Sequence, residues 1–136
     1  MKLFDIQAVG INSTFEKTFQ YVADIRNLPE RTHAFKRVSN GKAFLETPNG
    51  AVEIALEVNA SQEQGTIDWT MRFPDGSLSR AYSRVVKAEK NRCVYSFILM
   101  APPVPLEQLE GTLRQQSQVL EKELARLTSI LSEEPD

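Results

Sequence analysis

Residues 105–132, PLEQLEGTLRQQSQVLEKELARLTSILS, decide the fold of this chain. Leucines recur there at intervals of three, four and seven, and they form one apolar stripe: Leu106, Leu109, Leu113, Leu120, Leu124, Leu127 and Leu131. Pro105 suits the first turn of a helix, where its missing N–H would have had no partner. The pattern predicts a helix on the order of 40 Å long, whose apolar stripe the rest of the chain must cover.

Gln116 and Ser117 interrupt this stripe, where a leucine is due. Either a polar turn is tolerated within the core, or the helix passes at this level over something other than packed side chains. Under the second interpretation, Gln116 and Ser117 line a binding site together with Leu113, one turn earlier.

The composition indicates one globular domain over residues 1–136, because a chain of this length with 41% apolar content can bury a single core. The formal net charge is −2 with the two signs interleaved, which leaves no broad cationic surface for nucleic acid. No segment has the apolar length of a bilayer span, and charges stand at the N-terminus where a signal peptide needs an apolar run. Cys93 is the only cysteine, so no intrachain disulfide, metal cluster or cofactor is expected. We therefore expect a cytoplasmic protein.

The segment before residue 35 predicts one strand followed by two short helices. Residues 3–9 alternate and place three apolar side chains on one face, namely Phe4, Ile6 and Ala8. Ser13–Glu16 is a capping-box sequence, in which the first hydroxyl and the last carboxylate each take a free N–H, so a helix is expected over residues 14–23. Pro29 then breaks the helical pattern, and a short second helix or an irregular loop is expected to continue to about His33.

Residues 35–100 predict six antiparallel strands. The dipeptides Asn40-Gly41, Asn49-Gly50 and Asp75-Gly76 are typical of two-residue type I′ turns, whose central residues need a positive φ. Lys90-Asn91 is a weaker turn of the same kind, and residues 62–65 close a longer loop. The expected strands are residues 35–39, 42–47, 51–59, 66–73, 78–88 and 93–100.

The turns also set the register, which decides the side chains that share a face of the sheet. A two-residue turn at Asp75-Gly76 places Trp69 opposite Tyr82, and the same count places Tyr82 opposite Leu99. The face so defined is apolar, and the long helix is expected to cover it. Its members are Ala43, Leu45, Val52, Ile54, Leu56, Ile67, Trp69, Met71, Phe73, Leu78, Tyr82, Tyr95, Phe97 and Leu99, together with the charged residues Arg80 and Arg84.

The predicted order of elements resembles the helix-grip fold of the START/Bet v 1-like (SRPBCC) superfamily. Residues Ile11–Asp24 are similar to the opening of that family, in which a short helix ends in an Asp. Residues 75–77, 83–86 and 97–103 resemble small bacterial members of its polyketide cyclase/dehydratase-like group. The resemblance covers essentially the whole chain and implies an α+β fold, with a seven-stranded antiparallel sheet curled around the last helix. It also implies an apolar pocket for a small molecule or lipid near the two short helices, with no invariant catalytic motif.

Arg80, Tyr82 and Arg84 are the candidates for polar ligand binding. Two guanidinium groups on an apolar face need partners, because burying a lone charge is costly, and a carboxylate or phosphate of a ligand would supply them. Three alternatives remain: the arginine heads reach water at the rim, they pair with Glu110 or Glu121, or a one-residue bulge turns them outside. The apolar part of the candidate pocket comprises Trp69, Met71, Tyr95 and Phe97.

His33 and Tyr82 are the candidate catalytic residues. His33 is the only histidine of the chain, and histidine is the residue type best suited to act as the general base of a cyclase or dehydratase step. A loop histidine without function and a core tyrosine are the alternatives. Binding of an apolar small molecule or lipid, with an anionic group that the arginines would hold, is the leading hypothesis, because no carboxylate falls on the predicted pocket face. A cyclase-like lyase acting on a carbonyl compound and a protein-interaction module of the same fold are the alternatives.

Four apolar residues fall on the face that should meet water, namely Val85, Val94, Ile98 and Met100. Either the register slips there or that face is covered by a second copy of the chain. A homodimer is the simplest explanation.

Overall fold

The long helix α3 extends over Leu106–Ser132, as the leucine periodicity predicts. The structure, a computed structural model, describes residues 3–47, 50–101, 104 and 106–132, so the expected roles of Pro105 and Asn49 lie outside the described residues. The remaining elements are β1 (Phe4–Ile11), α1 (Phe15–Ala23), the 3-10 turn η1 (Ile25–Asn27), α2 (Leu28–Arg31), β2 (Phe35–Ser39), β3 (Lys42–Thr47), β4 (Gly50–Ser61), β5 (Thr66–Arg72), β6 (Leu78–Glu89) and β7 (Arg92–Met100). The order of elements is the predicted one. No helix within the described ranges is long and apolar enough to cross a membrane.

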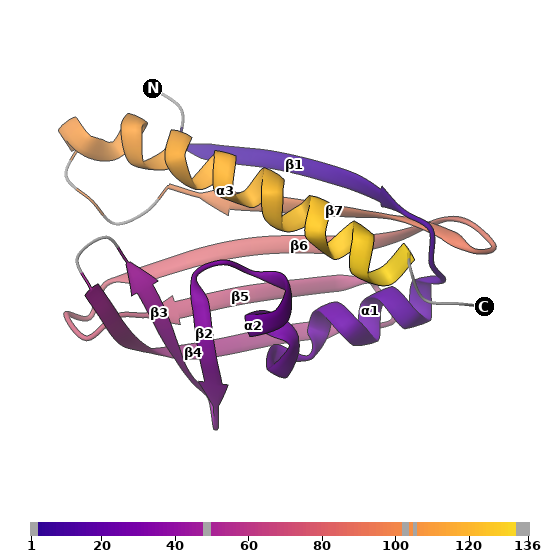
Figure 1. The fold of residues 1–136 in the computed structure, drawn as a ribbon, viewed down its shortest axis with the longest axis horizontal. Helices are drawn as coiled ribbons and strands as arrows, with labels where there is room; N and C mark the ends of the chain where they lie inside the picture. Colours follow the sequence, from indigo (N-terminus) through magenta and orange to yellow (C-terminus); the bar gives the residue numbers. More distant parts are fainter. Residues whose placement is uncertain (1–2, 48–49, 102–103, 105, 133–136) are drawn as a thin grey trace.

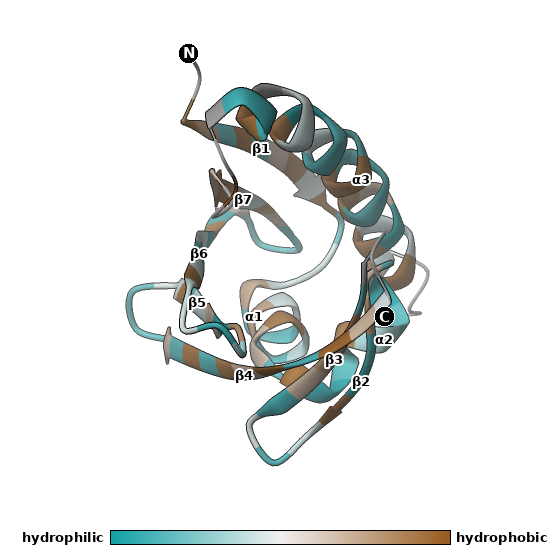
Figure 2. Ribbon diagram, turned by 90° about the vertical axis from the view of Figure 1, so that its left-hand side faces the viewer, coloured by the Kyte–Doolittle hydropathy of each residue, from teal (hydrophilic) through white to brown (hydrophobic). Residues whose placement is uncertain are grey.

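The seven strands form one antiparallel sheet in the order β1-β7-β6-β5-β4-β3-β2. β2 to β7 follow one another as a meander, and β1 pairs with β7, so β1 and β2 are the two edges. The sheet is strongly curved, and α3 lies across its open side next to β1 (Figures 1 and 2). This arrangement is the α+β helix-grip fold, and it places one concave sheet face opposite three helices.

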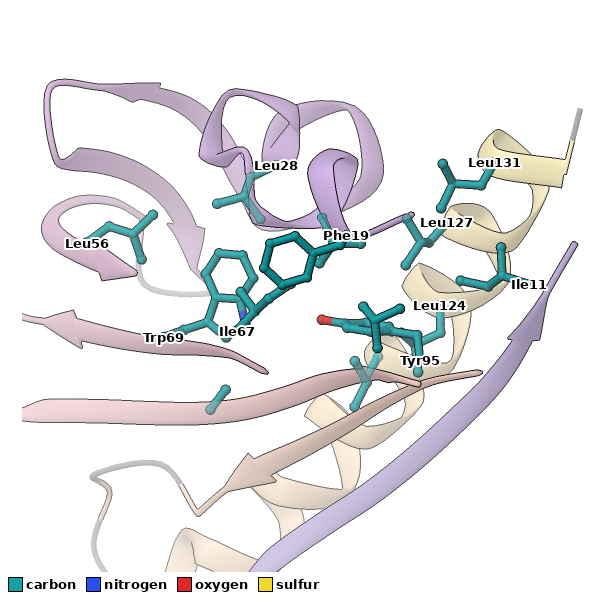
Figure 3. Packing of buried hydrophobic residues seen from close by; sticks show 14 of the residues in the cluster. Ile11, Phe19, Leu28, Leu56, Ile67, Trp69, Tyr95, Leu124, Leu127 and Leu131 are labelled. Atoms are coloured by element: carbon teal, nitrogen blue, oxygen red, sulfur yellow. The ribbon is translucent and has the colours of Figure 1, made fainter. Parts of the chain in front are cut away.

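The core lies between the concave sheet face, α1, α2 and the second half of α3 (Figure 3). Its largest fully buried side chains include Ile11, Ile67, Tyr95 and Leu127. Removing one such aliphatic side chain from water is worth about 1.5–3 kcal/mol, so the leucine stripe of α3 is the main force holding the helix on the sheet. The buried leucines of that half are Leu120, Leu124, Leu127 and Leu131.

The hairpin at Asp75-Gly76 differs from the prediction by one residue. The Phe73 N–H donates to the Ser77 carbonyl oxygen at 2.9 Å, and the Gly76 N–H donates to the Phe73 carbonyl oxygen at 2.9 Å. These bonds enclose a three-residue loop in which Gly76 has a φ of 89°, the arrangement of a turn followed by a glycine bulge. Because side chains alternate along a strand, this one extra residue exchanges the two faces of β6.

The predicted faces of β6 are therefore wrong. Its concave face carries Ala81, Ser83 and Val85, and its outer face carries Arg80, Tyr82 and Arg84. The turn at Lys90-Asn91 is present, but a bulge between Lys87 and Glu89 shifts the register of β6 against β7 by one residue as well. The two shifts compensate, so β7 keeps its predicted faces, with Tyr95 on the concave side. The type I′ turn at Asn40-Gly41 is confirmed, with φ of 50° and 77°.

Phe4, Ile6 and Ala8 share one face of β1, as the alternation predicts, and this face is the outer one. β1 turns Asp5, Gln7, Val9 and Ile11 toward the concave side. The predicted helix cap, in contrast, is wrong. The helix that follows is capped by Thr14, whose Oγ1 accepts from the Lys17 N–H at 3.2 Å, and not by Ser13. The inward Asp5 and Gln7 side chains bond to Ser117 of α3, a partner distant in the sequence that the alternation of β1 does not reveal.

Candidate functional site

Several apolar side chains on the concave face are only half-buried, although α3 lies opposite them. Met71, Phe73, Phe97 and Leu99 alternate inward in step with the fully buried Trp69 and Tyr95. Inward residues of a filled core exclude water almost completely. Water therefore reaches these side chains, so this part of the concave face carries accessible apolar surface.

A buried arginine lies at the other end of this lining. Arg31 is only 6% exposed, and its guanidinium carbon lies 5.6 Å from the centroid of the Trp69 ring. Its Nη2 donates one long hydrogen bond, 3.5 Å, to the Val22 carbonyl oxygen. Among the described residues, Arg31 Nε has no hydrogen-bond partner. A guanidinium is always protonated in proteins, so this buried cation is stabilised by the aromatic face and by the nearby Glu123 carboxyl rather than by a full set of hydrogen bonds.

The hydroxyl of Tyr95 lies in the same region. Tyr95 is completely buried, and within the described part of the chain its hydroxyl oxygen has no hydrogen-bond partner. Figure 3 shows this oxygen pointing into the core from β7. Burial raises the pKa of Tyr95, and the nearby Arg31 charge and the polar atoms of Ser83 and Trp69 oppose that shift. Ser83 beneath them is satisfied, since its Oγ donates to the Ile67 carbonyl oxygen at 2.6 Å and accepts from Trp69 Nε1 at 3.3 Å.

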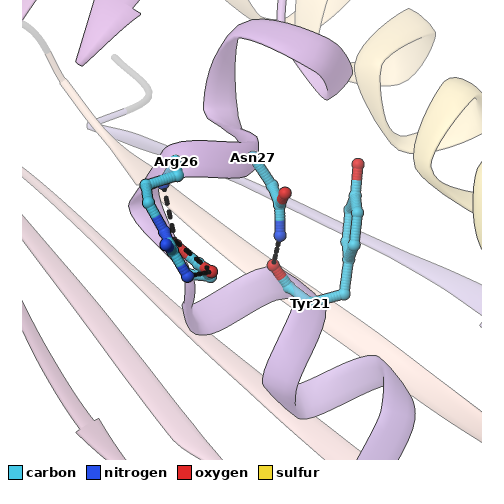
Figure 4. Close-up of polar contacts among 4 residues, drawn as sticks. Tyr21, Arg26 and Asn27 are labelled. Carbon is cyan, nitrogen blue, oxygen red and sulfur yellow. Dashed lines mark hydrogen bonds and ion pairs between the residues drawn. The ribbon is translucent and has the colours of Figure 1, made fainter.

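The connection between α1 and α2 aims Arg31 at the core. Arg26 pairs with Asp24 at 2.7 Å and lowers the pKa of that carboxyl, while Asn27 Nδ2 donates to the Tyr21 carbonyl oxygen at 2.9 Å (Figure 4). These bonds fix the turn that precedes α2. Residues three apart share one face of a helix, so Arg31 is buried on the same side as Leu28.

A surface pocket of about 420 Å³ opens between α2 and α3 and reaches Arg31. Its wall comprises Pro29, Glu30, Arg31, Thr32, His33, Val119, Lys122, Glu123 and Arg126. Two hydrogen bonds join its sides: the His33 N–H donates to Glu123 Oε2 at 2.7 Å, and Arg126 Nε donates to the Glu30 carbonyl oxygen at 2.6 Å. Burial raises the pKa of Glu123, an effect that the backbone N–H of His33 and the Arg31 charge oppose. Arg31 therefore forms part of the wall of a solvent-filled surface pocket as well as part of the core.

The interruption of the leucine stripe is a polar junction between α3 and β1. Ser117 Oγ donates to Asp5 Oδ2 at 2.7 Å, and Gln7 Nε2 donates to the same carboxylate at 2.8 Å and to the Ser117 carbonyl oxygen at 2.8 Å. Gln116 Oε1 is buried and has no partner among the described residues. At this level the helix thus passes over hydrogen-bonded polar groups of β1 and not over packed apolar side chains.

The structure separates the predicted site residues into two groups. Those on the concave side or on the face of α3 that covers it are Trp69, Met71, Tyr95, Phe97, Leu113, Gln116 and Ser117. Arg80, Tyr82 and Arg84 are exposed on the outer face, so their predicted place in the pocket is wrong, and the open alternative of a one-residue shift is what occurs. The His33 side chain is exposed at the pocket wall, and Tyr82 cannot act with it from the opposite side of the sheet.

Sequence reasoning missed Arg31, Ser83 and Glu123. Arg31 follows Leu28 at helical spacing, and this was the one available signal that it shares a buried face. Ser83 is absent from the predicted pocket face because of the error in register, and Glu123 lies among other charges of α3 with no distinguishing pattern. Within the described ranges, no group of three His, Cys, Asp or Glu side chains is placed to hold a metal ion.

Comparison with known proteins bears on the fold. No protein-family model and no curated protein matches the sequence. A START superfamily protein from Mycobacterium smegmatis is similar in structure, with a TM-score of 0.69 at 14% identity over 96% of this chain and 97% of the other. The chain has the START-like fold. The Zhui aromatase/cyclase from Streptomyces sp. R1128 has a TM-score of 0.65 at 10% identity, covering 96% and 92% of the two chains. The Aha1 dimer from Colwellia psychrerythraea has a TM-score of 0.70 at 13% identity, covering 97% and 98%.

Proposed function

We propose that this START-like protein binds a small apolar molecule that carries a carboxylate or another anionic oxygen. The observation that supports it is that two donors on the concave side, Arg31 Nε and the Tyr95 hydroxyl, are buried and have no hydrogen-bond partner among the described residues. Buried donors without partners are rare, because each costs about 1–3 kcal/mol. One ligand oxygen between them would remove both costs.

The apolar body of the ligand would then lie against the half-buried side chains of the concave face. Met71, Phe97 and Leu99 present apolar surface that water reaches, and covering such surface is favourable by roughly 25 cal/mol per Å². The Trp69 ring behind the guanidinium limits the space on the other side. Ligands of this description include fatty acids and aromatic acids, and the pocket between α2 and α3 would admit them to Arg31.

The test measures binding of 1-anilinonaphthalene-8-sulfonate, an apolar anion, and of Nile red, an apolar neutral dye. Arg31→Met keeps the length and apolar character of the side chain but removes the charge. Loss of a charged hydrogen bond of about 1.5–3 kcal/mol should weaken binding of the anion by roughly tenfold to a hundredfold, and leave binding of the neutral dye unchanged. Arg84→Met is the matched control, since that arginine is exposed on the outer face.

Equal affinity of wild type and Arg31→Met for the anion would overturn the proposal. Native mass spectrometry of the protein as purified, followed by solvent extraction, is the complementary measurement. A bound acid that is retained by Arg84→Met and lost by Arg31→Met would support it and identify the ligand class.

Catalysis on a carbonyl compound is the second candidate. It is favoured by the same two donors, because together they would stabilise the negative oxygen of an enolate. The test is incorporation of deuterium into benzoylacetone, an aromatic 1,3-diketone, measured by NMR. Faster exchange with wild type, lost in both Arg31→Met and Tyr95→Phe, would support an enzyme. If the exchange rate with wild type equals the rate without protein, the chain does not stabilise enolates of this compound class. The binding function would not be affected by that result.

A further inference from the structure

The convex side of the sheet carries an apolar surface on one half only. We call the outward side chains of β1, β6 and β7 the convex patch: Phe4, Ile6, Tyr82, Val86, Val94, Ile98 and Met100. Five of them are exposed large residues, with exposed fractions of 43% for Phe4, 55% for Ile6, 38% for Tyr82, 42% for Val86 and 36% for Val94. The expectation that Val94, Ile98 and Met100 face outward is confirmed, whereas Val85 faces the core.

The strand register makes these side chains one continuous surface. Ile98 pairs with Ile6 on one side and with Tyr82 on the other, so three apolar residues cross three neighbouring strands in one row. Val94 likewise pairs with Val86. The patch leaves on the order of 500 Å² of apolar surface in water, which is as large as the largest patch of a typical monomer. An antiparallel sheet with one solvated face normally places polar residues there.

The other half of the convex side follows that rule and carries charges of both signs. β4 presents Glu57 outward and β5 presents Asp68, while Arg80 and Arg84 of β6 border the patch. Within the described residues, neither of these arginines has an ion-pair partner. A surface that binds anionic lipid or nucleic acid carries an excess of cations, which this balanced border does not provide.

A second copy of the chain fits these features. In a two-fold interface each surface meets itself, so it must carry its own complement: apolar opposite apolar, and cations opposite carboxylates. The convex patch has Arg80, Arg84 and Asp68 at its edge and Glu57 one strand further out, so it offers apolar residues together with charges of both signs. A patch of this size with a polar rim approaches the roughly 800 Å² per partner of a standard interface. We infer that the chain forms a symmetric dimer through the convex patch, with the ligand-binding face of each protomer turned away from the interface.

Sedimentation equilibrium of the full chain over a wide concentration range tests this inference. Wild type should have twice the mass of one chain, and Ile98→Glu should be a monomer, because it places an unpaired charge in the centre of the interface. Ala55→Glu, an outward position of β4 beyond the patch, is the matched control and should remain a dimer. Circular dichroism establishes that each variant is folded, and Ile6→Glu provides a second patch variant should Ile98→Glu not fold.

A wild type that is monomeric at every concentration, or folded patch variants that remain dimers, would overturn the inference. The assay also includes sedimentation with vesicles of phosphatidylcholine and phosphatidylglycerol. Monomeric protein that binds these vesicles in wild type but not in Ile98→Glu would identify the patch as a membrane-docking surface and would equally refute the dimer. Binding of 1-anilinonaphthalene-8-sulfonate by Ile98→Glu is measured as well. If this variant binds the anion as wild type does, failure of the dimer inference leaves the ligand-binding proposal intact.

Discussion

The guanidinium of Arg31 lies over the indole of Trp69, 5.6 Å from the ring centroid, in a site from which water is almost excluded. A buried cation with one long hydrogen bond costs free energy that the aromatic face and the nearby Glu123 carboxyl only partly offset. We therefore expect Arg31→Met to leave the ligand-free protein as stable as wild type or more stable, by about 1–3 kcal/mol. Urea unfolding measures the change. A large loss of stability would mean that Arg31 is a structural residue.

Gly65 is predicted to tolerate no side chain. Its φ is 75°, and a Cβ there would lie 2.3 Å from the Val85 carbonyl oxygen, a backbone atom that cannot swing aside. Gly65→Ala should lower the free energy of unfolding by about 3 kcal/mol or more. Gly76→Ala is the control, because that residue has a similarly positive φ with nothing within 4 Å of a Cβ, and about 1–2 kcal/mol is expected. Equal losses would show that the contact with Val85 is not the cause.

Thr14 and Ser13 provide a direct comparison of the observed and the predicted helix cap. Thr14→Ala removes the acceptor of the Lys17 N–H and should cost about 1 kcal/mol. Ser13→Ala removes a buried hydroxyl that has no partner among the described residues, so it should be neutral or slightly stabilising. Thermal unfolding of the two variants distinguishes the caps. The reverse order of stabilities would restore Ser13 as the cap.

The polar junction between α3 and β1 is predicted to be worth more than a surface hydrogen bond. Ser117→Ala removes the donor 2.7 Å from the Asp5 carboxylate, which is 8% exposed, so about 1–3 kcal/mol of stability should be lost. Gln118→Ala, the exposed neighbour on the same helix, controls for the change in helix propensity. A cost no greater than that of the control would show that the junction contributes nothing.

Glu123 should make stability fall as the pH rises from acid to neutral. Its pKa in the folded protein is raised above the ordinary value of 4.5 by burial, so between that value and the raised pKa the folded state binds more protons than the unfolded chain. The free energy of unfolding then decreases with increasing pH across this window. Glu123→Gln should remove that decrease and stabilise the protein more at pH 7 than at pH 4. Glu121→Gln, exposed on the same helix, should change little.

The sequence alone determined the elements and their order. The leucine spacing of residues 106–131 and the alternation between residues 35 and 100 are local patterns, and each needs only near neighbours in the chain to be recognised. Turn dipeptides such as Asn40-Gly41 likewise act over a few residues. For these reasons the elements, their order and the concave positions of Trp69 and Tyr95 followed from the sequence, whereas the helix-grip arrangement of these elements was implied by the resemblance to the START/Bet v 1-like superfamily.

The faces of β6 and the site itself were decided only by the tertiary structure. The Asp75-Gly76 dipeptide is compatible with a two-residue or a three-residue loop, and the difference of one residue moves Arg84 from the pocket to the outer face. Arg31 is buried because α2 packs over Trp69, a residue 38 positions away that no local pattern connects to it. Periodicity is a property of neighbours in the chain, whereas burial of a charge depends on which distant elements close over it.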